Sequence, residues 1–526
     1  MKRFNVTGTC YPDEHYMVDI SERLEIIAQM VGRGDYFCIN AGRQYGKTTT
    51  LYALRKVLAP DYEVYAISFE GLADASYATE ADLAYAIVRQ FQMASMRRSS
   101  NLSEPVKAIV EDILKDAKQE RRIELEDFSM MISNLCQASP KPLVLIIDEV
   151  DQASNHESFV RILGLLRAKY LERTDLPTFQ SVILAGVYDI KNLKLKIRPD
   201  GEHQYNSPWN IAARFDVDMS LPADGIEGMI AEYKRDHAGV PEVDIMDAHE
   251  MAQFLYDYTS GYPFLVSRLC QILDEKKLCW DKEGFLEATK VIYLENNTIF
   301  DDMLKKLDDY PELSNMLQAM LFLGKLFIFN PDNKVFNLAR MFGYIKPNAN
   351  GKAVISNRIF ETRLYNYYSS KEESSKIFSI GAIEKNQFIQ NGQIDMEHLL
   401  SRFSVHFIDI YGNKDGKFVE EQGRKYFLLY LKPIINGVGN YYIESKTRDE
   451  TRTDIIIDYL GYQYIIELKI WRGNAYNERG EDQIAGYLDL YHAKKGYLVS
   501  FCFNKNKESG VKTIQAGERE IVECVV

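Results

Sequence analysis

A short stretch near the amino terminus has the residue types and spacing needed to bind phosphate. Residues 41–49 read Ala-Gly-Arg-Gln-Tyr-Gly-Lys-Thr-Thr and lie between an apolar run, Tyr36–Asn40, and a helical stretch. Gly46 lets the backbone wrap around phosphates, whose charge the successive N–H groups and the helix amino terminus then bind. We expect Lys47 to reach the β and γ phosphates and the hydroxyl of Thr48 to ligate Mg²⁺.

This stretch matches the phosphate-loop pattern G-x-x-x-x-G-K-[ST] except at the first glycine, where Ala41 stands. The substitution can restrict the geometry of the loop, so the rate of hydrolysis is left open. A chance Gly-Lys-Thr at a helix start is the alternative, and the strand and helix on either side argue against it. The predicted nucleotide-binding residues of the loop are Gly42, Arg43, Gln44, Tyr45, Gly46, Lys47, Thr48 and Thr49.

A second pattern with acidic residues follows further along the chain. The apolar run Leu143–Ile147 ends in Asp148 and Glu149, as a Walker B strand does. In such a strand the Asp holds the water shell of Mg²⁺ and the Glu polarises the attacking water. An acidic pair after a strand is common by itself, so the order of the two motifs carries the prediction. Together they predict ATP and Mg²⁺ as cofactors, with Thr48 and Asp148 as metal ligands and Glu149 as a catalytic residue.

Other parts of such a site have weaker signals. Tyr188 or Asp189 ends a third apolar strand, where related ATPases have a γ-phosphate sensor, but a plain strand-end turn explains them equally well. The stretch Gly261–Phe264 opens a helix whose Arg268 is a candidate nucleotide-binding arginine. For each arginine, a solvated or ion-paired side chain is the stronger alternative. The candidate arginine fingers are Arg198 and Arg214.

A second group of reactive side chains lies near the carboxyl terminus. Two apolar strands are expected on either side of a turn at Leu460–Gly461, and a hairpin centred there places Asp454 opposite Glu467. Glu467 and Lys469 are two apart on one strand and therefore share a face. Opposed carboxylates repel unless a cation lies between them, and Mg²⁺ would bind both and activate a water. Lys469 would orient that water or stabilise charge on a phosphate.

This Asp and Glu-x-Lys arrangement is the signature of PD-(D/E)xK nucleases. Glu420 and Glu421 lie on the preceding helix, where that family has an acidic first motif, and Gln483 and Tyr487 match its Q-x-x-x-Y element. Thr453 replaces the proline that usually precedes the Asp. The apolar surroundings argue against a solvated strand face, and an inactive nuclease fold is the alternative. The predicted catalytic residues are Asp454, Glu467, Lys469 and Gln483, and the predicted metal ligands are Asp454, Glu467 and Glu421.

The remaining sequence must position these two sites in an α/β fold. Strands alternating with amphipathic helices over 1–290 predict a parallel sheet with crossover helices and a helical lid. Residues 291–370 are helical with a hairpin turn at Asn348–Gly351, which fits a winged helix and a helical lid extension equally well. Residues 371–400 predict a linker, and 401–526 predict an α/β nuclease-like domain.

The chain resembles bacterial AAA-ATPase-like proteins that carry a C-terminal domain of the PD-(D/E)xK nuclease superfamily. The segments that carry the resemblance are Tyr16–Ser21, Gly42–Thr48, Met341–Tyr344, Asn357–Glu361, Leu428–Tyr441 and Ile465–Trp471. The resemblance implies an AAA-type P-loop ATPase core fused to a restriction-endonuclease-like fold. A role in defence or in mobile elements follows only by analogy, because a fold does not define a function.

Composition limits the partners. Lys and Arg total 63 and Asp and Glu total 76, a net charge of -13, so DNA must meet a local basic surface. The seven cysteines show no Cys-x-x-Cys pair, which predicts a reducing compartment without a disulfide framework or zinc site. Because no signal-like or membrane-spanning apolar run is found, we expect a cytoplasmic protein with no membrane partner.

These observations leave functions of different classes. The first is an ATPase coupled to a metal-dependent DNA nuclease, in which ATP gates or positions the nuclease. The alternative is a nucleotide-switched signalling or assembly ATPase that forms homo-oligomers through its ATPase domain, with the nuclease fold as a non-catalytic binding module. A transcription-linked ATPase that reads DNA through residues 310–370 is a third. The basic residues expected to touch DNA phosphates are Lys446, Arg448, Arg452, Arg472, Lys494 and Lys495.

Overall fold

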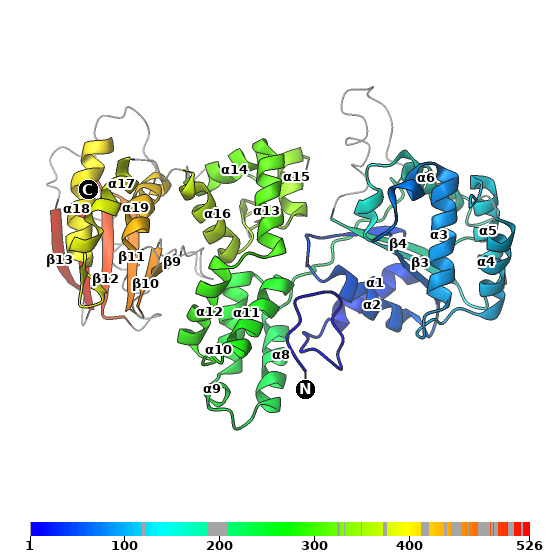
Figure 1. Cartoon of the computed structure of the whole chain (residues 1–526), viewed down its shortest axis with the longest axis horizontal. Coiled ribbons are helices and arrows are strands. Elements are labelled where there is room, and N and C mark those ends of the chain that lie inside the picture. Colours follow the sequence, from blue (N-terminus) through cyan, green and yellow to red (C-terminus); the bar gives the residue numbers. More distant parts are fainter. Residues whose placement is uncertain are drawn as a thin grey trace. The chain divides into compact units, whose positions relative to one another are not determined.

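The chain divides into two compact units, which are described one at a time (Figure 1). A computed structural model describes residues 2–117, 121–187, 209–322, 327–330, 332–348, 350–371, 376–411, 420–435, 439–442, 455–460, 462–471, 484, 488, 493–502, 510–516 and 519–526. The first unit contains Met1–Tyr256, Gly261–Phe285 and Met341–Gly343, and the second contains Asp257–Ser260, Leu286–Arg340 and Tyr344–Val526.

A parallel sheet forms the centre of the first unit, so the predicted parallel α/β arrangement is confirmed. Its described strands lie in the order β1-β4-β3-β2. Every residue of β3 and β4 is buried, as expected for strands covered on both faces. Because β4 lies between β1 and β3, its carboxyl end lies between the phosphate loop and the acidic pair. The strands are β1 (Phe37–Asn40), β2 (Glu63–Ser68), β3 (Leu143–Asp148) and β4 (Ser181–Gly186).

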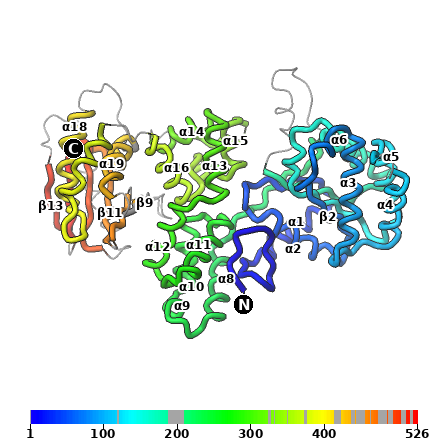
Figure 2. Tube along the Cα trace, in the orientation of Figure 1, coloured from blue at the N-terminus to red at the C-terminus, as the bar shows by residue number. Residues whose placement is uncertain are grey.

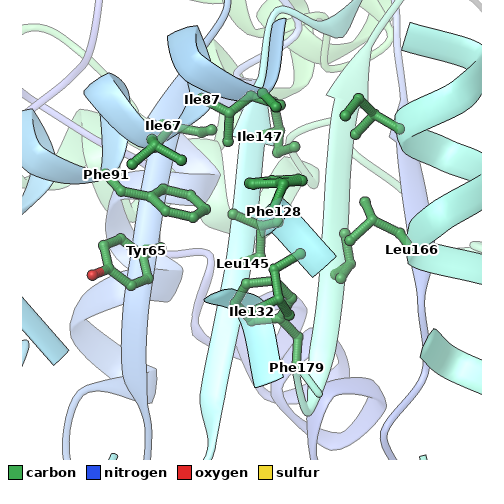
Figure 3. Close-up of a cluster of buried hydrophobic side chains, with 14 of the residues drawn as sticks. Tyr65, Ile67, Ile87, Phe91, Phe128, Ile132, Leu145, Ile147, Leu166 and Phe179 are labelled. Carbon is green, nitrogen blue, oxygen red and sulfur yellow. The ribbon is translucent and has the colours of Figure 1, made fainter. Parts of the chain in front are cut away.

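Helices cover both faces of this sheet. Alternate residues of β3 divide between two cores, since Leu145 packs with the helices on one face and Ile146 with those on the other. Figure 3 shows the first core, where the rings of Tyr65 and Phe91 stack with centroids 4.3 Å apart. The helices and short turns are α1 (Ser21–Gly32), α2 (Lys47–Leu58), η1 (Asp74–Tyr77), α3 (Glu80–Ser95), α4 (Glu104–Asp116), α5 (Leu125–Ala138), η2 (Val150–Ala153) and α6 (Glu157–Leu171).

A helical part completes the first unit and holds the amino-terminal segment. Phe4 and Tyr16 pack against Tyr233 of α8 with ring centroids 5.0 and 5.2 Å away, and the Tyr16 hydroxyl donates to Asp236 at 3.0 Å. Figure 2 shows this segment beside α8. The helices of this part are α8 (Ala223–Asp236), α9 (Pro241–Asp244), α10 (Ala248–Thr259), whose last three residues belong to the second unit, and α11 (Pro263–Glu275).

The second unit begins with helices and a small hairpin. The predicted sequence of helices followed by a hairpin is observed: β5 and β6 pair antiparallel, and Asn348 accepts the Lys352 N–H at 2.9 Å across the turn. Helix α16 begins at Asn357, whose side chain accepts the Phe360 N–H at 2.8 Å as an N-cap. The elements are α12 (Lys282–Leu294), α13 (Thr298–Asp309), α14 (Pro311–Phe322), α15 (Lys334–Met341), β5 (Ile345–Pro347), β6 (Ala353–Ile355) and α16 (Arg358–Ser370).

A mixed sheet forms the carboxyl-terminal part of the second unit, with strand order β13-β14-β12-β11-β10-β9. Ile455 of β10 pairs with Ile466 of β11, which confirms the register of a hairpin centred on Leu460–Gly461 for the described residues. Strand β12 runs parallel to both β11 and β14. The strands are β9 (Gly439–Tyr442), β10 (Ile455–Tyr459), β11 (Tyr462–Ile470), β12 (Lys495–Phe501), β13 (Gly510–Ala516) and β14 (Arg519–Val525).

The range 371–400 contains folded elements in its described part, where a linker was expected. A Cβ on Gly381 of α17 would lie 2.2 Å from the Tyr430 carbonyl oxygen of α19, so these helices touch backbone to backbone. Glu384 binds Arg402 and accepts from His406 at 3.0 Å and from the Tyr430 hydroxyl at 2.8 Å. The elements are α17 (Lys376–Glu384), η4 (Lys385–Gln387), β7 (Ile389–Gln390), β8 (Gln393–Ile394), α18 (Met396–Tyr411) and α19 (Glu420–Ile435).

None of the described helices is long and apolar enough to cross a membrane.

Candidate functional site

The phosphate loop joins β1 to α2 in the way the sequence predicts. Gly46 stands just before α2 with a φ of 77°, a left-handed conformation that favours glycine. Gln44 also has a positive φ, 54°. Within the described residues no side chain caps α2, so the N–H groups of its first turn are available to an anion.

Lys47 lies buried inside this loop. Its Nζ donates to the carbonyl oxygens of Ala41 and Gly42, each at 2.9 Å. Burial lowers the pKa of Lys47, and nearby carboxylates oppose that shift, Asp151 most strongly. Because Ala41 acts through its backbone carbonyl, the missing glycine does not prevent the loop from closing around the lysine.

The two predicted motifs meet directly. The Thr48 hydroxyl donates to Asp148 Oδ2 at 2.7 Å, although the residues are 100 apart in sequence. Asp148 Oδ1 accepts the N–H of Glu149 at 2.9 Å, and Glu149 has a φ of 53°, which is uncommon for a residue other than glycine. Burial, and then the charge of Asp148, raises the pKa of Glu149. This donor set of a hydroxyl and carboxylate oxygens fits Mg²⁺.

Asp151 belongs to the same site and was not among the residues predicted from the sequence. The N–H of Val187, directly after β4, donates to Asp151 Oδ2. A Cβ on Gly186 would lie 2.8 Å from Asp151 Oδ1, so the carboxylate lies directly against the β4 backbone. A third acidic residue so soon after Asp148 was the available signal. The predicted sensor residues Tyr188 and Asp189 and the finger candidate Arg198 lie outside the described residues.

Residues distant in sequence also contact the phosphate loop within the first unit. The Tyr262 hydroxyl donates to the Arg43 carbonyl at 2.5 Å, and its ring lies edge-on to Tyr45 with centroids 4.5 Å apart. A Cβ on Gly42 would lie 3.0 Å from the Phe342 carbonyl oxygen. Both residues lie in stretches that stand out in the sequence, Gly261–Phe264 and Met341–Tyr344, but no pattern there places Tyr262 or Phe342 on the loop.

The arginines expected to act on the nucleotide have partners elsewhere. Arg268 Nη1 lies 2.7 Å from Gln271 Oε1 and 3.3 Å from Glu275 Oε2, both on its own helix α11. Arg214 Nε donates to Asp216 at 2.7 Å, and its side chain is exposed. Their roles in nucleotide binding stay predictions.

The amino-terminal segment lies against the first turn of α2. The N–H of Cys10 donates to the Thr49 hydroxyl at 3.1 Å, and the rings of Tyr11 and Tyr52 meet edge-on with centroids 5.1 Å apart. Thr49 therefore holds the amino-terminal segment against α2. Its predicted contact with nucleotide stays a prediction.

The second candidate site is described in part. Glu467 is fully buried on β11, and Lys469 Nζ lies 2.8 Å from its Oε1, so the structure brings these two predicted residues together. Asp454, Gln483 and Tyr487 lie outside the described residues, as do the basic residues Lys446, Arg448, Arg452 and Arg472. Glu420 and Glu421 begin α19, but their side chains lie outside the described part.

A row of polar residues continues from Lys469 across the sheet, and its middle members, Ser500 and Glu523, are buried. Lys469 pairs with Ser500 on β12, whose hydroxyl donates to Glu523 Oε1 on β14 at 2.6 Å. Lys512 Nζ on β13 lies 2.6 Å from Glu523 Oε2. Glu523 is fully buried. Ser500 and Glu523 could have been predicted from the sequence, because each is a polar residue within an otherwise apolar strand.

The parallel sheet and the loop between β1 and α2 match a core of the P-loop ATPase type in a mixed α/β protein. Solved structures with low similarity include the Walker-type ATPase of Pyrococcus abyssi (TM-score 0.46, 13% identity, 69% of this chain and 99% of that one). The Aeropyrum pernix ORC2 protein in its ADP form (0.35, 10%, 70% and 96%) and the ORC1 protein of the same organism in complex with DNA (0.28, 12%, 66% and 93%) are others. No protein-family model and no curated protein sequence matches the chain.

Proposed function

We propose that the first unit binds ATP with Mg²⁺ and hydrolyses it. The hydrogen bond from Thr48 to Asp148 carries the proposal, because it brings a phosphate-loop hydroxyl and a strand-end carboxylate to one point between β1 and β3. A chance Gly-Lys-Thr would have no reason to meet a buried aspartate 100 residues away. Mg²⁺ held there by Thr48 and Asp148 would neutralise charge that develops on the phosphates.

The side chains of this site have separate tasks. Lys47 is already directed into the loop by the carbonyls of Ala41 and Gly42, and we propose that it exchanges these acceptors for the β and γ phosphates. Glu149 follows Asp148 directly and would orient the attacking water. The first N–H groups of α2 would bind the remaining phosphate charge.

Measurements of ATP binding and phosphate release test this proposal. We expect Lys47→Ala to weaken binding of a fluorescent ATP analogue, and Glu149→Gln to bind it normally while releasing phosphate at least about a hundredfold more slowly. Lys56→Ala on the same helix is the matched control, because Lys56 is exposed and its Nζ lies over the ring of Tyr52, 4.7 Å from the centroid. Equal binding and turnover in wild type and Lys47→Ala would contradict the proposal.

We further propose that residues 401–526 form a metal-dependent nuclease-like domain that acts on DNA under control of the ATPase. Support comes from the fully buried Glu467 with its lysine partner and from the β10–β11 register. A buried carboxylate is costly unless a cation compensates it. Lys469 is that cation here, and a buried Glu with a Lys two residues later is the pair that a nuclease metal site would use.

A cleavage assay tests the nuclease proposal. Linear, circular, single-stranded and duplex DNA would be incubated with Mg²⁺ or Mn²⁺, with and without ATP. We expect wild type to cut, Lys469→Ala to be inactive, and Lys47→Ala to lose the effect of ATP. Cleavage by Lys469→Ala at the wild-type rate would refute the assignment.

The alternative function is an ATP-switched assembly protein whose carboxyl-terminal fold binds without catalysis. Tyr262 and Phe342, which contact the phosphate loop from distant parts of the chain, favour a loop whose occupancy is sensed elsewhere. ATP-dependent change in size on a column, with no cleavage of any DNA, would support it. The helices and hairpin of residues 291–370 are proposed as a winged-helix-like DNA-binding segment in either case.

A further inference from the structure

The turn that follows Glu149 contacts the end of β4. Strand β3 ends at Asp148, Glu149 takes a left-handed conformation, and η2 then begins at Val150. This reversal brings Asp151 back to β4, where its Oδ2 accepts the N–H of Val187. One short turn therefore carries both the proposed catalytic carboxylate and a carboxylate bound to the neighbouring strand.

The contact between Asp151 and β4 is close enough to be selective for glycine. A Cβ on Gly186 would lie 2.8 Å from Asp151 Oδ1 and 3.0 Å from Val150 Cγ2. Both distances are shorter than ordinary van der Waals contact, so a larger residue at position 186 would push the side chains of Asp151 and Val150 aside. The side chain of Asp151 therefore packs directly against the backbone of β4, where only glycine leaves room for it.

Asp151 also lies near the phosphate loop. The Ala41 N–H at the start of the loop donates to the carbonyl oxygen of Gly186 at 3.2 Å. The end of β4 that Asp151 contacts is therefore also hydrogen-bonded to the phosphate loop, and the turn of Asp151 carries the proposed catalytic carboxylate.

We infer that Asp151 is a positioning residue for ATP hydrolysis, which ties the carboxyl end of β4 to the turn carrying Glu149. The tie holds the turn that carries Glu149 against the end of β4, so that the catalytic carboxylate faces the terminal phosphate. This inference rests on the proposed ATPase function of the same site. The same contact would be present if Asp151 only stabilised the fold, so the experiment must distinguish a positioning role in hydrolysis from a role in stability alone.

Three variants make that separation. Asp151→Ala removes the acceptor for the Val187 N–H, whereas Asp151→Asn keeps an acceptor oxygen and removes the charge. Gln152→Ala changes an exposed residue of the same turn and is the matched control. Thermal melting of each variant shows whether the fold is retained.

The expected results differ between binding and turnover. We expect Asp151→Ala to lower kcat at least about tenfold, because misplaced catalytic groups lose rate steeply, while a fluorescent ATP analogue still binds within about threefold of wild type. Asp151→Asn should keep most of the wild-type kcat, and Gln152→Ala all of it. Wild-type kcat in Asp151→Ala would overturn the inference, as would equal losses in both Asp151 variants or a loss confined to binding.

Hydrogen exchange decides the inference independently of turnover. A non-hydrolysable ATP analogue with Mg²⁺ should slow amide exchange over residues 181–187 in wild type and much less in Asp151→Ala. Equal slowing in both proteins would overturn the inference, even if wild type turned out not to hydrolyse ATP. If wild type neither binds the analogue nor shows slowing, the proposed ATPase function and the inference fail together, whereas binding with equal slowing removes only the inference.

Discussion

Removing the hydroxyl of Thr48 is a direct test of how the two motifs cooperate. Thr48→Ala deletes the group that donates to Asp148 at 2.7 Å and that would ligate Mg²⁺, and it leaves the backbone of the loop intact. Thr48→Ser restores the hydroxyl and removes only a methyl group. The pair of variants therefore isolates one oxygen atom.

The size of the effect follows from the chemistry of that oxygen. A hydrogen bond to a charged group contributes about 1.5–3 kcal/mol, and about 1.4 kcal/mol corresponds to tenfold in a binding constant. We therefore expect Thr48→Ala to lose about ten- to hundredfold of the affinity that Mg²⁺ adds to ATP binding. Binding of ATP without metal should change little, because the N–H groups of the loop and Lys47 remain.

The assay is a titration of a fluorescent ATP analogue with and without Mg²⁺ for wild type, Thr48→Ala and Thr48→Ser. Wild type and Thr48→Ser should both bind more tightly when Mg²⁺ is added, and Thr48→Ala should gain little. An undiminished gain in Thr48→Ala would show that Thr48 and Asp148 do not form the metal site, and the reasoning from their contact would be refuted.

Three further predictions concern the second unit, and the last of them uses a control residue in the first unit. Lys469→Met should lower the melting temperature, because it leaves the Glu467 carboxylate charged without the lysine that lies 2.8 Å away. The double variant with Glu467→Gln should recover part of that loss. Neither variant should cut DNA. For Glu384, burial by itself would raise the pKa, but hydrogen bonds from Arg402 and its other partners outweigh it and lower the pKa below 4.5. The charged Glu384 therefore stabilises the fold above the pKa that it has in the unfolded chain, and this stabilisation is lost as the pH falls through its pKa in the folded protein. Glu384→Gln should be less stable than wild type by about 1–3 kcal/mol at neutral pH. Melting curves recorded over a pH series should show this difference shrinking below pH 4.5. Gly381→Ala should destabilise the protein by about 1–3 kcal/mol, because its Cβ would lie 2.2 Å from the α19 backbone. Gly164→Ala in α6 should stabilise it slightly, because no atom lies within 4 Å of the added Cβ. Equal shifts of the melting temperature in the two variants would contradict the close contact at Gly381.

Contiguous patterns were sufficient for several elements. The phosphate loop could be predicted because its function depends on consecutive backbone N–H groups at a helix start, which a short stretch such as Gly46–Thr48 encodes. The β10–β11 register could be predicted because a tight turn and alternating side chains specify hairpin pairing locally. A linker was wrongly predicted for 371–400 because the range begins with the polar residues Lys371–Ser375, although the apolar helix α17 follows them.

The sequence by itself determined the identity of the phosphate-loop and strand-end residues, the parallel sheet and the hairpin register, because each depends on neighbours in the chain. Only the tertiary structure decided which distant residues meet them: Asp151 at the end of β4, Tyr262 on the loop, and Glu523 bound to Ser500. These contacts depend on how helices and strands pack against one another. The periodicity of apolar residues predicts the helices and strands themselves but not which of them pack together. The role of Ala41 was decided in the same way, since it is the backbone carbonyl, which any residue provides, that holds Lys47.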